Sequence, residues 1–96
     1  MSIRLMVTIT AVPGKGAELA AQYRGRCVDV MKEPGCEQFE VFQSVLDPDR
    51  LVLLERWRDA AALAEHAKVN EARAPLPPGL RQGSGEREDY TYNRTR

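Results

Sequence analysis

The sequence predicts one α+β domain whose strands and helices follow each other in the order βαββαβ. Segments rich in β-branched residues with an alternating apolar pattern are separated by two segments whose apolar residues recur at helical spacing. Pro and Gly mark the breaks between them. The length of 96 residues fits a single domain, and a content of 43% hydrophobic and 29% charged residues is typical of a globular protein.

The first strand is expected over residues 3–12. Ile3, Leu5, Val7 and Ile9 fall on one of its faces at period two, and the segment 13–16 ends it with Pro and Gly. A helix should follow and end before Pro34, although Gly25 inside it costs about 1 kcal/mol relative to Ala. Its apolar residues lie close to helical spacing: Leu19, Tyr23, Cys27, Val30 and Met31.

Residues 36–46 and 51–58 are predicted to form a hairpin. Phe39, Val41 and Val45 alternate with polar residues in the first strand. The connecting segment 47–50, Asp-Pro-Asp-Arg, has Pro in the second position, which type I turns favour. The two strands are therefore expected to be antiparallel neighbours.

A second helix is expected over residues 60–69, with Asp59 as its N-cap. Leu63 and Ala67 lie one turn apart and should pack on the sheet, with His66 at the edge of that face. Beyond Ala74 the Pro and Gly content predicts a loop over about 75–85, which cannot remain helical. The last strand is expected within residues 86–95.

The order βαββαβ defines the ferredoxin-like arrangement, a four-stranded antiparallel sheet with both helices on one face. The other face needs a cover, because the run 51–54 is apolar on both sides of its strand and Met6 and Val12 lie opposite the apolar row of the first strand. An apolar sheet face of this kind usually marks an interface. We therefore predict a homodimer formed through the sheets.

Charge and motifs exclude several classes of function. Lys and Arg balance Asp and Glu at 14 each, so no overall field favours nucleic acid or an acidic membrane surface. No apolar run is long enough for a signal peptide or membrane span, and we expect a cytoplasmic protein. Cys27 and Cys36 fit no metal-binding spacing and are expected to be free thiols. No nucleotide or other organic cofactor motif is present, so we expect neither a metal nor a cofactor.

Four pieces of the chain together resemble the antibiotic biosynthesis monooxygenase family over residues 3–70. They are Pro34-Gly35-Cys36-Glu37-Gln38-Phe39-Glu40, then Asp47-Pro48-Asp49-Arg50, then Leu54-Glu55-Arg56-Trp57, and His66 on the next helix. The resemblance implies a dimeric α/β barrel with a pocket between the helices and sheet of each subunit. Many relatives are oxygenases without metal or flavin that convert hydroquinone- or anthrone-like substrates into quinones, and a few related branches cleave haem.

The sequence also departs from the family pattern in two places. Many members carry a second His about five residues after the first, whereas Lys68-Val69-Asn70-Glu71 follows His66 here. A proton relay through two imidazoles is therefore in doubt. The Pro-rich segment from Pro75 onward also interrupts the region in which relatives continue a helix, so the pocket should have a different roof. The segment 74–85 is predicted to be a lid or rim of that pocket, or else a plain connector.

His66 is the candidate catalytic residue, since it is the only His and its unperturbed pKa lies near neutrality. The alternative is a structural His that bonds a backbone carbonyl or a Tyr hydroxyl. Glu55 is expected to pair with an arginine rather than to act as a general base. The candidate substrate-binding residues, each of which could instead simply fill the core or an interface, are Trp57, Tyr23, Phe39, Leu63, Tyr90 and Tyr92.

The leading functional hypothesis is a cofactor-independent monooxygenase that oxidises a small aromatic hydroquinone- or anthrone-like substrate with dioxygen. One alternative is a non-catalytic ligand-binding or stress-response protein with the same fold. The other is a haem-binding or haem-degrading relative. The position at which haem-cleaving relatives carry a strand Asn falls around Val7 or Ile9, which weighs against haem.

Overall fold

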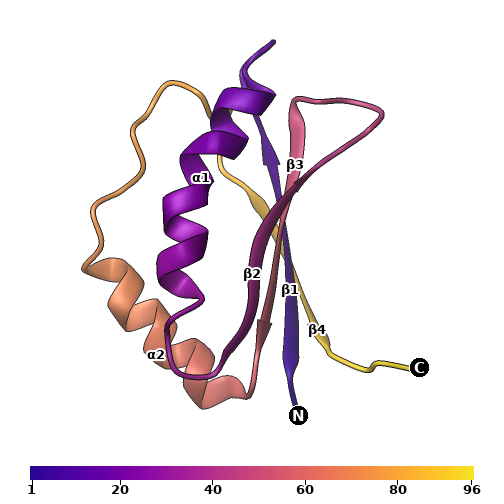
Figure 1. Cartoon of the computed structure of the whole chain (residues 1–96), viewed down its shortest axis with the longest axis vertical. Helices are drawn as coiled ribbons and strands as arrows, with labels where there is room; N and C mark the ends of the chain where they lie inside the picture. Colours follow the sequence, from indigo (N-terminus) through magenta and orange to yellow (C-terminus); the bar gives the residue numbers. More distant parts are fainter.

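The computed structural model describes all 96 residues, Met1–Arg96, and has the expected order of elements (Figure 1). The N-terminal strand leads through a Pro-Gly turn into the longer of the two helices. A hairpin and the second helix follow, and a long loop leads to the last strand. The elements are β1 (Ile3–Thr10), α1 (Gly16–Val30), β2 (Cys36–Gln43), β3 (Arg50–Trp57), α2 (Ala60–Glu71) and β4 (Glu86–Thr91).

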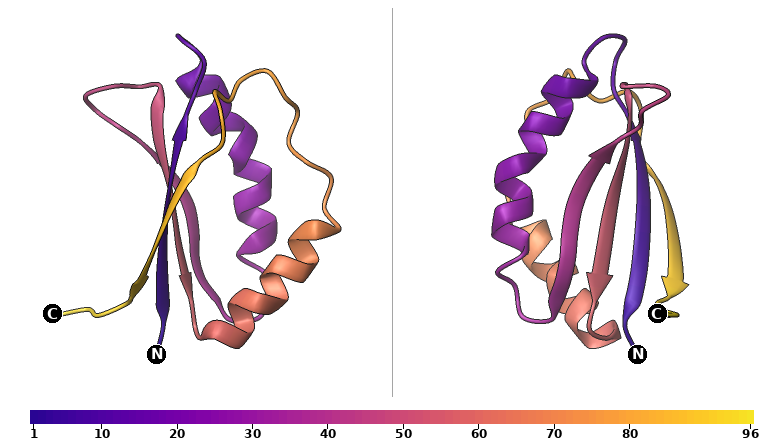
Figure 2. Two further views of the ribbon diagram at one scale, coloured as in Figure 1. Left: turned by 180° about the vertical axis from the view of Figure 1, so that it is seen from behind. Right: turned by 45° about the vertical axis from the view of Figure 1, so that its right-hand side comes forward.

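The four strands form one antiparallel sheet in the order β2-β3-β1-β4, and both helices lie on one of its faces (Figure 2). This is the predicted ferredoxin-like arrangement. The sheet of the single chain is open, with β2 and β4 at its edges. Neither helix combines the length and the apolar character that a membrane crossing requires.

The core lies between the sheet and α1. Leu5 and Ile9 of β1 pair with Glu55 and Leu51 of β3, and their side chains point toward the helices. Trp57, at the end of β3, is completely buried. The other buried apolar residues are Ala11, Leu19, Tyr23, Val30, Phe39, Leu51, Leu53 and Ala62.

A carboxylate clamps the start of α1 to the hairpin loop. Asp49 accepts hydrogen bonds from the backbone N–H groups of Gly14 (2.9 Å) and Gly16 (3.0 Å). The backbone approaches so closely that a Cβ on Gly16 would lie 1.8 Å from the carbonyl oxygen of Pro48. The start of α1 is therefore fixed at Gly16, because only glycine fits against Pro48 and because the carboxylate of Asp49 binds the free N–H groups at this end of the helix.

The hairpin confirms the predicted turn but corrects the length of its first strand. The N–H of Arg50 donates to the carbonyl of Asp47 (2.9 Å), which closes the turn around Pro48. β2 ends at Gln43, however, because the Ser44 hydroxyl accepts the N–H groups of the next loop residues. Val45 is consequently 98% exposed and does not continue the buried face, as the alternating pattern had indicated.

The second helix packs through a different face from the one expected. Its buried residues are Ala62 and His66, whereas Leu63 is half-buried and Ala67 is exposed. Asp59 is the N-cap as predicted and accepts the N–H of Ala62 at 2.8 Å. The imidazole thus lies in the packing interface of the helix itself and not at its margin.

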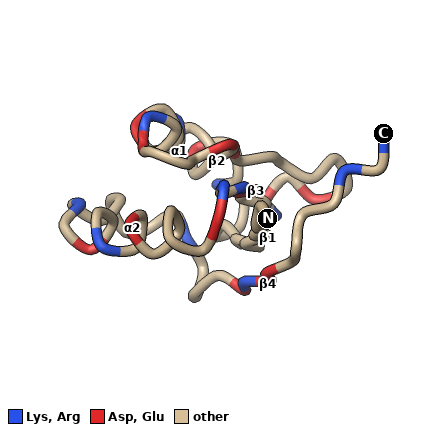
Figure 3. Tube along the Cα trace, turned by 90° about the horizontal axis from the view of Figure 1, so that it is seen from below, with Lys and Arg blue, Asp and Glu red and all other residues tan.

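The far face of the sheet has apolar residues at its centre and two arginines stacked on a tyrosine at one end. Met6 pairs with Leu54 there, and Phe42 beside them is 47% exposed. The guanidinium groups of Arg4 and Arg56 lie over the ring of Tyr92, at 5.2 Å and 4.7 Å from its centroid. Acidic and basic residues are interspersed along the chain (Figure 3).

Candidate functional site

His66 is held in the interior by two aromatic side chains from the sheet. Its ring centroid lies 4.5 Å from that of Trp57 and 5.8 Å from that of Phe39, and the residue is only 9% exposed. The cap of Asp59 sets the phase of α2 and so determines which residue of the helix meets Trp57. His66 therefore points toward the sheet and lies within reach of Trp57.

A buried carboxylate fixes the orientation of this imidazole. Oε1 of Glu33 lies 2.9 Å from Nδ1 of His66, while Oε2 of the same carboxylate accepts a hydrogen bond from Arg73 at 2.6 Å. Since the carboxylate already faces a guanidinium, it is an acceptor, and Nδ1 of His66 is the donor. In the neutral ring Nε2 is then the nitrogen with the free lone pair, and it makes no hydrogen bond within the chain.

Glu55 and Trp57 form a second polar pair beside the imidazole. Trp57 donates from Nε1 to Oε1 of Glu55 at 3.0 Å, and Glu55 is 5% exposed. Burial raises the pKa of the Glu55 carboxyl, while the Trp57 hydrogen bond and the charges of His66 and Arg87 act in the opposite direction. The expected ion pair between Glu55 and an arginine does not form, because the indole of Trp57 takes that place.

His66 and Glu55 border a cavity of about 560 Å³ between α2 and the sheet, which we call the histidine cavity. Its walls combine aliphatic side chains from β1 and α2 with the polar groups of Glu55, His66, Asn70, Glu71 and Arg87. The apolar residues among its lining are Leu5, Val7, Ala60, Leu63, Ala64 and Ala67. A largely apolar site with a few converging ionisable groups suits a planar organic ligand that exchanges a proton.

Three of the predicted ligand-binding residues belong to this site and three do not. Leu63 lines the histidine cavity. Trp57 and Phe39 do not line it, but their rings pack against the imidazole of His66. Tyr23 is a buried residue of α1 and borders a different cavity. Tyr90 pairs with Arg4, and Tyr92 lies under the same arginine, so both tyrosines are on the face of the sheet away from the helices and do not line this cavity.

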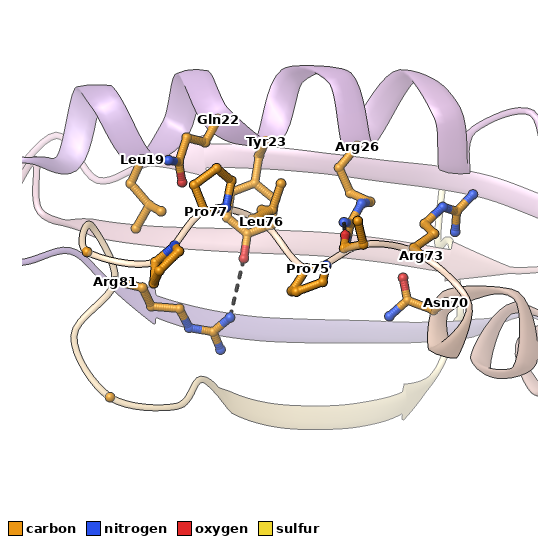
Figure 4. A pocket seen from close by; sticks show the side chains of 14 residues that line it. Leu19, Gln22, Tyr23, Arg26, Asn70, Arg73, Pro75, Leu76, Pro77 and Arg81 are labelled. Atoms are coloured by element: carbon orange, nitrogen blue, oxygen red, sulfur yellow. Dashed lines mark hydrogen bonds between the residues drawn. The ribbon is translucent and has the colours of Figure 1, made fainter.

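The segment 74–85 is not a lid over the histidine cavity. It leaves the C-terminal end of α2 and continues beside α1 (Figure 1), and none of its residues lines the cavity that contains His66. The segment instead encloses the cavity that contains Tyr23 (Figure 4). The physical reason is that α2 continues to Glu71, two residues beyond its predicted end, and carries the start of the loop past the imidazole.

The sequence did not predict several polar residues at or beside the site, among them three charged ones. Glu33 lies just before the Pro-Gly turn that follows α1, Arg73 follows the end of α2, and Arg87 lies on β4. Only Arg87 could have been predicted from the pattern of its strand. It pairs with Val7, whose side chain faces the helices, so the side chain of Arg87 faces the helices as well. The contact of Glu33 with His66 spans 33 positions of the chain and depends on tertiary packing.

Comparison with known proteins agrees with this architecture. The sequence profile of the antibiotic biosynthesis monooxygenase family matches residues 2–74, which is more than half of the chain. A structure from Pseudomonas aeruginosa is similar with 27% identity and a TM-score of 0.73, covering 97% of this chain and 95% of that one. A Shewanella oneidensis protein is 26% identical with a TM-score of 0.76, covering 93% and 88%.

A conserved protein from Methanosarcina mazei shares 21% identity with a TM-score of 0.77, covering 97% of this chain and 94% of its own. At that identity the likeness concerns the fold alone. No curated protein sequence matches the chain.

Proposed function

The chain belongs to the antibiotic biosynthesis monooxygenase family, and we propose that it oxidises a small aromatic hydroquinone- or anthrone-like substrate with dioxygen in the histidine cavity. The observation that carries this proposal is the state of His66. Its Nδ1 is bound to Glu33 and its Nε2 has no partner, in a cavity whose walls are largely aliphatic. Membership of the family supports a monooxygenase-like role in general, and the substrate class is the proposed part.

The reaction requires only a base, an electron-rich substrate and dioxygen. For an anthrone, removal of one proton from the CH₂ group between the rings leaves an enolate that donates electrons to dioxygen. A C–O bond forms to one oxygen atom, and the resulting peroxide anion takes the first proton back from the protonated base to give a hydroperoxide. Loss of the remaining C–H proton with cleavage of the O–O bond then yields the quinone carbonyl and one molecule of water, so that both oxygen atoms are accounted for.

In this scheme Nε2 of His66 accepts the first proton. Glu33 keeps the ring in the tautomer that leaves Nε2 free and stabilises the imidazolium that results. The aliphatic wall of Leu5, Val7 and Leu63 binds the ring system and excludes water. Arg87 and Asn70 are the polar groups available to hold the substrate oxygens.

We further propose that the working unit is a homodimer joined through the far face of the sheet. Met6, Leu54 and Phe42 would otherwise leave an apolar patch exposed to water. Both helices cover the opposite face, so this face is free to pack against the same face of a second sheet. Such packing would complete the barrel that a single chain does not close.

The experiment is oxygen uptake by the purified protein with an anthrone and with a dihydroxynaphthalene. We expect turnover of at least one of them, and a loss of about 10²-fold in His66→Ala, the usual size of a lost general base. Added imidazole should partly restore the rate of that variant, which a purely structural histidine would not allow. Binding of the substrates without oxygen uptake would overturn the proposal in favour of a non-catalytic binding protein.

A further inference from the structure

A second cavity, of about 470 Å³, lies between α1, the end of α2 and the segment 74–83 (Figure 4). We call it the arginine cavity, because three of its lining side chains are Arg26, Arg73 and Arg81. It contains neither His66 nor Trp57, and of its lining residues only Asn70 also borders the histidine cavity. The oxidation proposed above does not use it.

The charge of this cavity is one-sided. No Asp or Glu lines it, and only Arg73 has an acidic partner, Glu33 at 2.6 Å. Arg26 donates to the backbone carbonyl of Ala74 at 2.7 Å, and Arg81 lies 3.4 Å from the Tyr23 hydroxyl. Each guanidinium has five N–H donors, so Arg26 and Arg81 retain most of their donors for an anion.

A buried acceptor lies in the same wall and has no partner. Oε1 of Gln22 is shielded from solvent and makes no hydrogen bond, the one such side-chain atom in the protein. Figure 4 shows Gln22 between Leu19 and Tyr23 on the wall formed by α1. Buried polar atoms are nearly always satisfied, so this oxygen indicates a missing donor such as a ligand hydroxyl.

The rest of the lining fits the flat body of a ring. Leu19 and Tyr23 are buried and form the floor. The covering segment supplies three prolines and Leu76. Residues Pro75–Gly79 make no hydrogen bond with the rest of the chain, and Gly79 (φ 108°) and Gly83 (φ 68°) adopt backbone conformations that favour glycine. Residues 75–79 can therefore shift to admit a ligand without breaking a hydrogen bond, while Ala74, Leu80 and Gln82 stay anchored by theirs.

From this combination we infer that the arginine cavity binds a small aromatic hydroxycarboxylate. The carboxylate pairs with Arg81 and Arg26, a ring hydroxyl donates to Oε1 of Gln22, and the ring lies against Leu19, Leu76 and the prolines. A neutral ligand would leave both guanidinium groups without a counter-ion. A ligand without a hydroxyl would leave Oε1 of Gln22 without a hydrogen-bond donor.

Three related probes separate these contributions. Binding of 3-hydroxybenzoate, benzoate and 3-hydroxybenzamide is measured by NMR titration of the full chain at low salt. We expect 3-hydroxybenzoate to bind at least tenfold more tightly than the amide and severalfold more tightly than benzoate. The largest shifts should fall on Gln22, Tyr23 and Leu76.

The chain offers a matched control for the charge. Arg26→Gln and Arg81→Gln should each weaken 3-hydroxybenzoate about tenfold, whereas Arg24→Gln removes the same charge from an exposed position on the same helix and should leave the affinity unchanged. An equal loss in all three variants would show unspecific attraction and overturn the inference. Shifts centred on Leu63 and His66, or no binding at millimolar ligand, would also overturn it. Because the readout is binding, the outcome does not depend on whether the protein turns over an anthrone.

Discussion

Nδ1 of His66 lies 2.9 Å from Oε1 of Glu33, and the two residues are 33 positions apart in the chain. Both side chains are about nine-tenths buried, and Trp57 lies along the imidazole. The pair links the turn after α1 to the middle of α2. Its geometry is that of a base held by a carboxylate, so the carboxylate is the natural first target for mutation.

Glu33→Gln should lower oxygen uptake about tenfold or more while the protein still folds. The amide can keep one hydrogen bond but offers no negative charge to stabilise an imidazolium, and it no longer enforces one tautomer. Initial rates and thermal unfolding are measured together. Glu65→Gln, on the exposed side of α2, is the control and should retain the parental rate. A parental rate in Glu33→Gln would exclude the role assigned to the carboxylate.

Leu53→Lys and Leu54→Lys should fail in different ways, although the residues are neighbours. Leu53 is 7% exposed under the helices, and an ammonium there should abolish cooperative unfolding or lower the melting temperature severely. Leu54 pairs with Met6 on the far face, so Leu54→Lys should fold but sediment as the 10.8 kDa monomer. Circular dichroism and sedimentation equilibrium distinguish the cases, and a dimer in Leu54→Lys would place the interface elsewhere.

Two glycine substitutions should shift stability in opposite directions. Gly16→Ala places a methyl group 1.8 Å from the Pro48 carbonyl and should cost about 3 kcal/mol or more, because backbone must move on both sides. Gly25→Ala, within the same helix, meets nothing within 4 Å and should gain about 1 kcal/mol from helix propensity. Each kcal/mol corresponds to about 4–8 °C in melting temperature for a domain of this size. Two shifts of the same sign would contradict the packing described for Gly16.

Glu55→Gln should stabilise the protein at pH 7, and the gain should shrink on acidification. Burial raises the pKa of Glu55 above the ordinary value of 4.5, so the folded state binds its proton more tightly than the unfolded state. Wild-type stability therefore falls as the pH rises from the unfolded-state pKa to the folded-state pKa, and this loss is absent at lower pH. Gln retains an acceptor for Trp57 but does not titrate. Melting curves from pH 4 to pH 7 check the trend, and a constant difference would refute it.

Cys36 should be alkylated about 100-fold more slowly than a small free thiol at pH 8. Burial, with a further contribution from the charge of Glu33, raises its pKa from 9.0 to about 11, and only the thiolate reacts. Cys27 also has a raised pKa because of burial and should react slowly. Mass spectrometry after timed treatment with iodoacetamide measures both positions. Rapid labelling of Cys36 in the folded protein would contradict its placement beside Met31.

The elements and the face of each strand could be predicted because they follow from local patterns. The alternation of apolar residues in β1 predicted that Leu5 and Ile9 are buried, and Asp59 as a potential N-cap predicted the start of α2. Val45 was misplaced because the hydroxyl of Ser44 competes with strand pairing, which an apolar alternation does not reveal.

The candidate site was predictable only in part, since a site joins segments that are distant in sequence. The resemblance to a known family identified His66, and alternation placed Trp57 and Glu55 on one face of β3. The partner of His66 could not be read from the sequence, because an acidic residue at a helix end is usually solvated. The predicted partner of Glu55, an arginine, was wrong for a related reason. Trp57 lies two positions further along the same face of the strand, and its indole N–H binds the carboxylate instead.

The turn that carries Glu33 has a consequence for how relatives of this chain can vary. Gly35 has φ 81°, and a Cβ built on it would lie 2.5 Å from the Cβ of Ala62 on α2. Position 35 is thus restricted both by its backbone and by the helix that carries His66. In an alignment, we expect a glycine at 35 to occur with a small residue at 62, and we expect lineages that lose both to lose the acid at 33 as well. Substitution at position 35, which does not contact the substrate, would then determine whether His66 retains Glu33 as its partner.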